Sequence, residues 1–184
     1  MISSMTGKEE KYESPANQLC KACGLCCTGH LFIWTKLRSA ELDSIEALAV
    51  QVFRSVPSQR GFNQPCPLWQ GQCSIYTSTS YPRFCRTYKC SLLKKLLDES
   101  TSLPEALNLV DQAKEMIQEL EAMLPVSPNA NFRERLVAHL EALEEAGESV
   151  APDGVRFQQK AEALLVTFKE VFGVDDLTEK AIET

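Results

Sequence analysis

The stretch CKACGLCCTG, from Cys20 to Gly29, places four thiols within one turn-forming segment. Two cysteines separated by two residues can turn their thiols toward one ion, which is why zinc sites and iron–sulfur sites both use this spacing. A third cysteine at the same spacing is typical of ferredoxin-like ligation, in which a distant cysteine completes the site. The adjacent pair Cys26 and Cys27 is less usual, since neighbouring side chains seldom reach the same ion comfortably. One of them can ligate while the other serves a second site, bridges two ions or stays free.

All eight cysteines of the 184-residue chain lie in its first half, and none follows residue 90. The first 18 residues contain no apolar segment for secretion, and cytosolic thiols stay reduced. A bond between Cys26 and Cys27 would also strain the peptide that links them. Metal ligation therefore fits better than a disulfide framework, with zinc or iron as the ion and a [4Fe–4S] cluster as the alternative. The candidate ligands are Cys20, Cys23, Cys26, Cys27, Cys66, Cys73, Cys85 and Cys90.

The division of these thiols between ions stays open at the level of sequence. In one hypothesis Cys20 and Cys23 share an ion with two cysteines from residues 66–90, and Cys26 or Cys27 joins the remainder at a second ion. In another, four thiols hold one cluster and the other four are structural. Thiolates around two divalent ions would leave excess negative charge, which nearby basic residues can offset. Those residues are Lys21, Arg83, Arg86 and Lys89.

Three stretches together resemble the YkgJ-type CxxCxxCC cysteine-cluster family, over roughly residues 18–97. They are CKACGLCCTG from Cys20, CPLWQGQCSIY from Cys66 and YPRFCRTYKC from Tyr81. The resemblance implies a zinc- or iron-chelating domain, and the same domain occurs in flagellin lysine N-methylase. The chain has no convincing Gly-rich loop after a predicted strand that would suggest an S-adenosylmethionine pocket.

Metal binding through the eight cysteines is therefore the function we expect. An iron–sulfur protein in electron transfer is the first alternative. The second is an enzyme related to the lysine methylase, and the third is a sensor that works by reversible thiol oxidation. The sequence contains no H-E-x-x-H, no G-x-S-x-G and no P-loop, so it assigns no catalytic residue.

Charge is unevenly distributed along the chain. The net charge is -6, with 12 Lys and Arg against 8 Asp and Glu in residues 1–100, and 7 against 17 in residues 101–184. This balance argues against a nucleic-acid binder, and the acidic second half is a solvated surface or a site for a protein partner. Apolar runs fall short of the roughly 18 residues that a membrane span needs, so we expect a cytoplasmic protein and no membrane partner.

The fold class we expect is mainly α with small irregular or β elements. Residues 1–17 are expected to form a flexible tail, 18–100 a cysteine-rich metal-binding domain, and 101–184 an α-helical region. Residues 31–34 are a short apolar run that we expect to form a strand or a buried segment beside the metal site, and the breaker-rich segments 56–65 and 66–90 are expected to form loops, turns and short strands. Apolar spacing and capping residues predict helices over 40–55, 91–100, 103–124, 129–146, 156–172 and 175–183.

Two histidines and several aromatic residues complete the candidates. His30 follows Cys27 by three residues, and with eight thiols available we expect it to hydrogen-bond rather than ligate. His139 reads as an ordinary helix residue packed among apolar neighbours. The aromatic residues near the cysteines are expected to form an apolar shell that keeps water from the metal. They are Trp34, Trp69, Tyr76, Tyr81, Phe84 and Tyr88.

Overall fold

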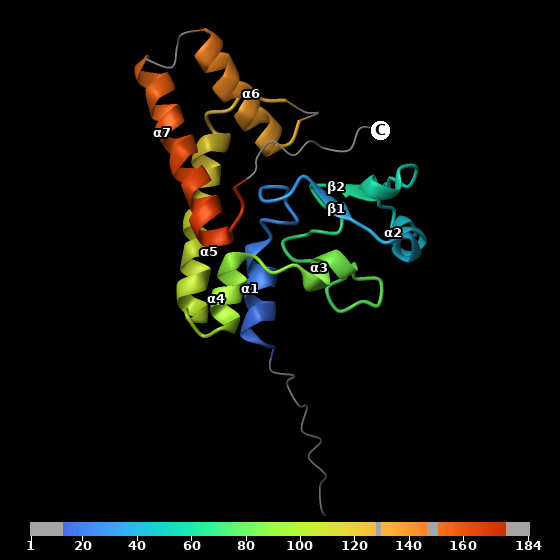
Figure 1. Cartoon of the computed structure of the whole chain (residues 1–184). Helices are drawn as coiled ribbons and strands as arrows, with labels where there is room; N and C mark the ends of the chain where they lie inside the picture. The colour runs from blue at the N-terminus through green and yellow to red at the C-terminus, as the bar shows by residue number, and fades with distance from the viewer. Residues whose placement is uncertain (1–12, 128–129, 147–150, 176–184) are drawn as a thin grey trace, which may run out of the picture.

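The computed structural model describes residues 13–127, 130–146 and 151–175, and its architecture is mainly helical with one small sheet (Figure 1). The expected fold class is confirmed. In chain order the elements are α1 (Pro15–Cys23), β1 (Trp34–Lys36), the 3-10 turn η1 (Ser39–Glu41), α2 (Leu42–Glu46), the 3-10 turn η2 (Pro57–Gln59), β2 (Gly61–Asn63), α3 (Arg83–Thr87), α4 (Ser91–Leu97), α5 (Leu103–Glu121), α6 (Phe132–Glu145), α7 (Pro152–Thr167) and the π-helical turn η4 (Phe168–Phe172).

Helix α1 begins inside the stretch that we expected to be a tail. Ser14 caps it by accepting a hydrogen bond from the backbone N–H of Asn17, and Pro15 occupies the first turn, where its missing N–H costs nothing. The helix ends at Gly24, which adopts the left-handed conformation with φ +69°. The expectation of a tail was therefore wrong for residues 15–17, and residues 1–12 lie outside the described part of the chain.

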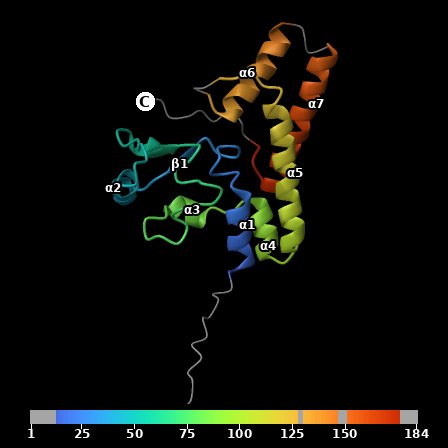
Figure 2. The same cartoon turned by 180° about the vertical axis from the view of Figure 1, so that it is seen from behind.

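Helices α1, α4 and α5 lie side by side, and the hairpin of α6 and α7 packs at the far end of α5 (Figures 1 and 2). Ser102 and Glu105 form the capping box that the sequence predicted at the start of α5. The core that joins these helices also takes in Leu19, Leu25 and Leu31 of the cysteine-bearing segment. The first cysteine motif is therefore built directly onto the helical core.

A second, smaller core lies beneath the sheet. Strands β1 and β2 pair antiparallel, with Trp34 opposite Asn63 and Lys36 opposite Gly61. Beside the sheet, Leu37, Ile45, Phe62 and their neighbours are buried together. In Figures 1 and 2 the sheet, α2 and α3 extend to one side of the helical stack. This half therefore has its own small core, separate from the one that joins the helices.

Several boundaries differ from the sequence predictions. The run 31–34, expected to be a strand or a buried segment, has Leu31 and Ile33 buried and only its last residue in the strand. The helix expected over 40–55 ends at Glu46. Ala49 has φ +61°, which terminates that helix and lets Val50 enter the small core. The segment expected to be a loop contains β2, and α3 is an unpredicted helix after Pro82.

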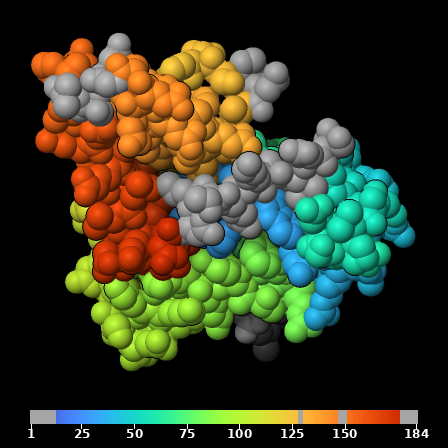
Figure 3. All heavy atoms as spheres, turned by 45° about the horizontal axis from the view of Figure 1, so that its top comes forward, coloured from blue at the N-terminus to red at the C-terminus, as the bar shows by residue number. Residues whose placement is uncertain are grey.

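The C-terminal helices form one flank of the molecule, shown in orange and red in Figure 3. The π-helical turn η4 ends at Gly173, where φ is +72° and an added Cβ would stand 2.2 Å from Ser91 Oγ. The predicted helix over 175–183 lies outside the described residues, apart from residue 175. Within the described part of the chain, none of the helices combines the length and apolarity that a membrane crossing requires.

Candidate metal centre

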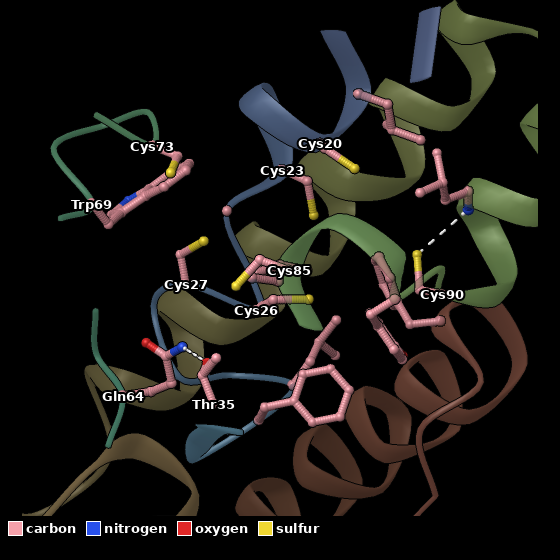
Figure 4. A pocket seen from close by; sticks show the side chains of 18 of the residues that line it. Cys20, Cys23, Cys26, Cys27, Thr35, Gln64, Trp69, Cys73, Cys85 and Cys90 are labelled. Carbon is pink, nitrogen blue, oxygen red and sulfur yellow. Dashed lines mark hydrogen bonds between the residues drawn. The ribbon is translucent and has the colours of Figure 1, made fainter. Parts of the chain in front are cut away.

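Most of the cysteines converge on one cavity between α1, the following loop, α3 and α4. The cavity holds about 100 Å³ of free space and is almost entirely apolar apart from the sulfur atoms. In Figure 4 thiols from segments far apart in the sequence point toward this shared space. The cysteines that line it are Cys20, Cys23, Cys26, Cys27, Cys73, Cys85 and Cys90.

The remaining cysteine, Cys66, is held beside the cavity through the backbone. Its N–H donates a 2.8 Å hydrogen bond to the carbonyl oxygen of Cys27. Gln64, two residues earlier, donates from its backbone N–H to the carbonyl oxygen of Ile33 at 2.8 Å. These two bonds fix the second cysteine-bearing segment against the first.

The turn after α1 sets how Cys26 and Cys27 lie relative to Cys20 and Cys23. Helix α1 carries Cys20 and Cys23, and the left-handed Gly24 then turns the chain so that Cys26 and Cys27 follow in a tight loop. Thr28 closes this loop, because its hydroxyl donates to the carbonyl oxygen of Gly24 at 3.0 Å and its N–H donates to the same oxygen at 2.9 Å. A side chain at position 24 would collide with the ring of Trp69, which stands 2.1 Å from an added Cβ.

One set of thiols gathers around Cys26. Burial and then the neighbouring Cys90 thiol raise the pKa of Cys20 to about 11. Burial raises the pKa of Cys23 to about 12, with Cys90 and Cys20 contributing in the same direction. The pKa of Cys26 is raised first by burial and then by the thiols of Cys23, Cys90, Cys27 and Cys20. These thiols therefore lie close enough to raise one another's pKa. We call Cys20, Cys23, Cys26 and Cys90 the first thiol set.

The second thiol set gathers around Cys27. Burial raises the pKa of Cys27, and the next causes are the thiols of Cys85, Cys66 and Cys73. The pKa of Cys85 rises to about 12 for the same reasons, burial first and then Cys66 and Cys73. We call Cys27, Cys66, Cys73 and Cys85 the second thiol set, although Cys23 also raises the pKa of Cys27 and Cys27 that of Cys26.

Backbone N–H groups point at sulfur atoms in both sets. Hydrogen bonds from the N–H groups two residues further along the chain lower the pKa of Cys23, Cys66 and Cys73, against the larger effect of burial. Cys90 accepts a hydrogen bond from the N–H of Leu93 at 3.4 Å. Such donors stabilise a thiolate without bringing in water, as the surroundings of metal–thiolate sites commonly do.

An aromatic shell surrounds the thiols, as the sequence predicted. All the proposed shell residues except Trp34 line the cavity. The sequence analysis missed Phe32, which joins them through edge-to-face contacts with Phe84 and Tyr88 at 5.8 and 4.8 Å between ring centroids. Burial and the neighbouring Cys20 thiol raise the pKa of Tyr76 to about 12, so its hydroxyl stays protonated.

His30 does not line the cavity. Its Nδ1 lies 2.7 Å from Thr28 Oγ1, and its ring stacks at a tilt on Phe132 of α6. Burial lowers the pKa of His30 to about 4, so the ring is neutral at physiological pH. His139 lies on α6 with its ring edge-to-face on Phe157, as expected for a packed helix residue.

The donor chemistry fits zinc or iron. All eight cysteines are free thiols, and soft sulfur ligands select these metals over magnesium or calcium. Among residues 13–127, 130–146 and 151–175, no three His, Cys, Asp or Glu side chains already stand close enough together to grip an ion. Ligation therefore requires the thiols to come closer together and to lose their protons.

The comparisons with known proteins agree with this chemistry. No curated protein and no solved structure matches the chain. Residues 19–120, from α1 to nearly the end of α5, match the family model CxxCxxCC, described as "Putative zinc- or iron-chelating domain". Because the match covers more than half of the sequence and includes all eight cysteines, the chain belongs to the CxxCxxCC family.

Proposed function

We propose that this protein binds two metal centres, one in each thiol set, and that Cys26 and Cys27 direct the chain from one centre to the other. Cys20, Cys23, Cys26 and Cys90 ligate the first centre, and Cys27, Cys66, Cys73 and Cys85 the second. Four thiolates form a complete tetrahedral set for zinc and an equally complete set for an iron–sulfur cluster. This division differs from the sequence hypothesis, in which Cys20 and Cys23 share an ion with two cysteines from residues 66–90, because here they share it with Cys26 and with Cys90 alone from that region.

The observation that carries the proposal is that two adjacent cysteines have different thiols as their nearest neighbours. The thiols that most affect Cys26 are Cys23 and Cys90, whereas those that most affect Cys27 are Cys85, Cys66 and Cys73. Neighbouring side chains on a tight loop point in different directions, so one dipeptide can supply a ligand to each centre. The thiols of the other set, Cys27 for Cys26 and Cys23 for Cys27, follow these in the order of effect.

Zinc is the ion that we assign to both centres in the first instance. Zinc needs no redox partner, and structural zinc contributes folding free energy of roughly 10 kcal/mol or more in small domains. The segment 56–90 carries few apolar residues and forms only short elements, so a bound ion supplies order that its own core does not. Metal binding therefore stabilises the half of the molecule that contains the sheet, α2 and α3.

A second candidate function, iron–sulfur binding, is favoured by one specific observation. In the first thiol set the spacing C-x2-C-x2-C is completed by the distant Cys90, while Cys27 belongs with the other set. The same plan operates in two-cluster ferredoxins, in which close cysteines hold one cluster and a further cysteine ligates the other. Electron transfer would follow from such clusters. Methyl transfer and cytoplasmic location stay predictions from sequence.

Cobalt titration of the reduced, metal-free chain tests the proposal. Cobalt(II) bound by four thiolates absorbs strongly, so the absorbance should rise until about two equivalents have been added and then stop. Saturation at one equivalent would contradict the two-centre arrangement. Protein purified without oxygen separates the two candidate metals, because zinc centres are colourless and iron–sulfur clusters are brown.

A further inference from the structure

An outer cleft lies against the cysteine cavity, on the side of α3 and the start of α4. It encloses about 490 Å³ and shares a wall with the cavity. The shared wall contains one thiol of each set, Cys20 and Cys85, together with the rings of Tyr76, Tyr81 and Tyr88. We call this the tyrosine cleft, and it leads from solvent to both proposed metal centres.

The tyrosines that form the wall are held by their hydroxyl groups. Tyr76 Oη donates to Asn17 Oδ1 at 3.0 Å, and Tyr81 Oη donates to the carbonyl oxygen of Cys85 at 3.2 Å. The two rings contact each other at a centroid distance of 5.1 Å.

The rim of the tyrosine cleft is positively charged. Arg86 and Lys89 are both exposed and both line the cleft, and no acidic side chain is among the described residues that line it. The Arg86 guanidinium lies 5.8 Å from the centroid of the Tyr81 ring, and its Nη2 donates to the Tyr81 carbonyl oxygen at 3.2 Å. Such a rim repels a bare divalent cation and attracts an anionic one-to-one complex.

The opposite side of the cavity offers a poorer route. A depression of about 300 Å³ reaches it beside Cys23, a thiol of the first set only. Trp69 shares that wall, and its ring packs against Gly24 without spare room. The tyrosine cleft is therefore the larger opening, and it reaches both thiol sets.

On the basis of the proposed function, we infer that the tyrosine cleft is the docking site for the carrier from which the metal is loaded, an anionic metal–polycarboxylate complex. Arg86 and Lys89 bind the carboxylates, and the metal is handed to Cys20 and Cys85 at the inner wall. Each ligating thiol gives up one proton as its sulfur–metal bond forms. The released carboxylates or solvent take those protons, and the charge of the metal ion does not change.

The test measures the rate of cobalt uptake by the whole, reduced, metal-free chain from two sources, cobalt(II) chloride and cobalt(II) citrate. The variant R86Q/K89Q removes the positive rim. The control variant K36Q/K95Q removes the same charge from exposed residues outside the cleft. We expect R86Q/K89Q to load about tenfold more slowly from citrate, to load no more slowly from chloride, and to lose the difference in high salt. The control should match the wild type with both sources.

Equilibrium cobalt content separates failure of this inference from failure of the proposed function. Equal citrate rates for R86Q/K89Q and the control would overturn the docking site, as would a chloride rate that falls as far as the citrate rate. A wild-type chain that binds no cobalt at all would overturn the metal centres themselves. The single variant K89Q guards against misfolding, because Lys89 forms no hydrogen bond or ion pair with the described residues. It should slow citrate loading about threefold at unchanged cobalt content.

Discussion

The carbonyl oxygen of Cys27 accepts a 2.8 Å hydrogen bond from the backbone N–H of Cys66, so two cysteines separated by 39 positions in sequence are fixed side by side without any metal. The bond aligns the first cysteine segment with the second before either thiol is deprotonated. The Cys27 thiol lies near those of Cys85, Cys66 and Cys73, while Cys26 packs against the helical core. Assembly of the two proposed centres thus starts from a partly organised framework.

Single substitutions in the adjacent pair should remove one centre each. Cys26→Ser is expected to lower the metal content by one ion and to leave the second centre loaded, because its partners are those of the first set. Cys27→Ser should remove the other ion, and the double variant should bind none. Metal content per chain, measured by elemental analysis, decides this. Retention of both ions in either single variant would contradict the division.

Metal affinity should rise with pH. Burial raises the pKa of Cys20 to about 11 and of Cys85 to about 12, so these thiols are protonated in the unloaded protein at pH 7. The unloaded protein therefore binds more protons than the loaded one, and raising the pH favours the loaded form. About four protons should leave per ion bound. An indicator dye in weakly buffered solution measures the number of protons released per chain. That number should halve in Cys26→Ser, because this variant is expected to load only the second centre. Binding without proton release would exclude thiol ligation.

Gly24→Ala should weaken metal binding at the first centre. Gly71→Ala should weaken binding less, at both centres. Both glycines have a positive φ, +69° and +77°, and alanine there costs roughly 1 kcal/mol of backbone strain. At position 24 the added Cβ would also lie 2.1 Å from Trp69, whereas nothing lies within 4 Å at position 71. We expect Gly24→Ala to lose several kcal/mol of stability and the first ion. Thermal unfolding and metal content measure both effects, and equal losses in the two variants would refute the steric argument.

Chelation should unfold the two halves of the molecule unequally. Removing the metal is expected to loosen residues 18–97, chiefly the segment around β2 and α3, while α5 to α7 keep much of their helix through the apolar core. Hydrogen exchange before and after chelation measures this by region. Ser102→Ala, which removes the cap of α5 at a cost of about 1 kcal/mol, should instead raise exchange in α5 without loss of metal. Unchanged exchange throughout the chain after chelation would contradict the stabilising role.

The helices were predictable from sequence where local signals were strong. Ser102, Pro104 and Glu105 specify the start of α5, and the apolar residues behind them repeat at helical spacing. The same kind of apolar pattern predicted a helix over 40–55, which was too long. Ala49 leaves the helical conformation, and Val50 then joins the small core. Tertiary packing, which no local pattern records, decided that boundary.

The candidate site was only half predictable. Spacing and composition singled out eight cysteines, seven of which line the cavity, and most of the aromatic residues around it. The division between Cys26 and Cys27 depends on the turn at Gly24 and on the hydrogen bond from Cys66, which joins distant segments. Phe32 was missed because its role comes from contacts with Phe84 and Tyr88. Its place between the cysteines and β1 was the one signal that could have revealed it.

The most direct test of the two-centre account is X-ray absorption at the metal edge, combined with metal analysis, on protein purified without oxygen. The account predicts two centres per chain with sulfur as the only protein ligand, at about four sulfur atoms per zinc and roughly 2.3 Å for each bond. A single mononuclear ion per chain, or a first coordination shell made largely of nitrogen and oxygen, would contradict it.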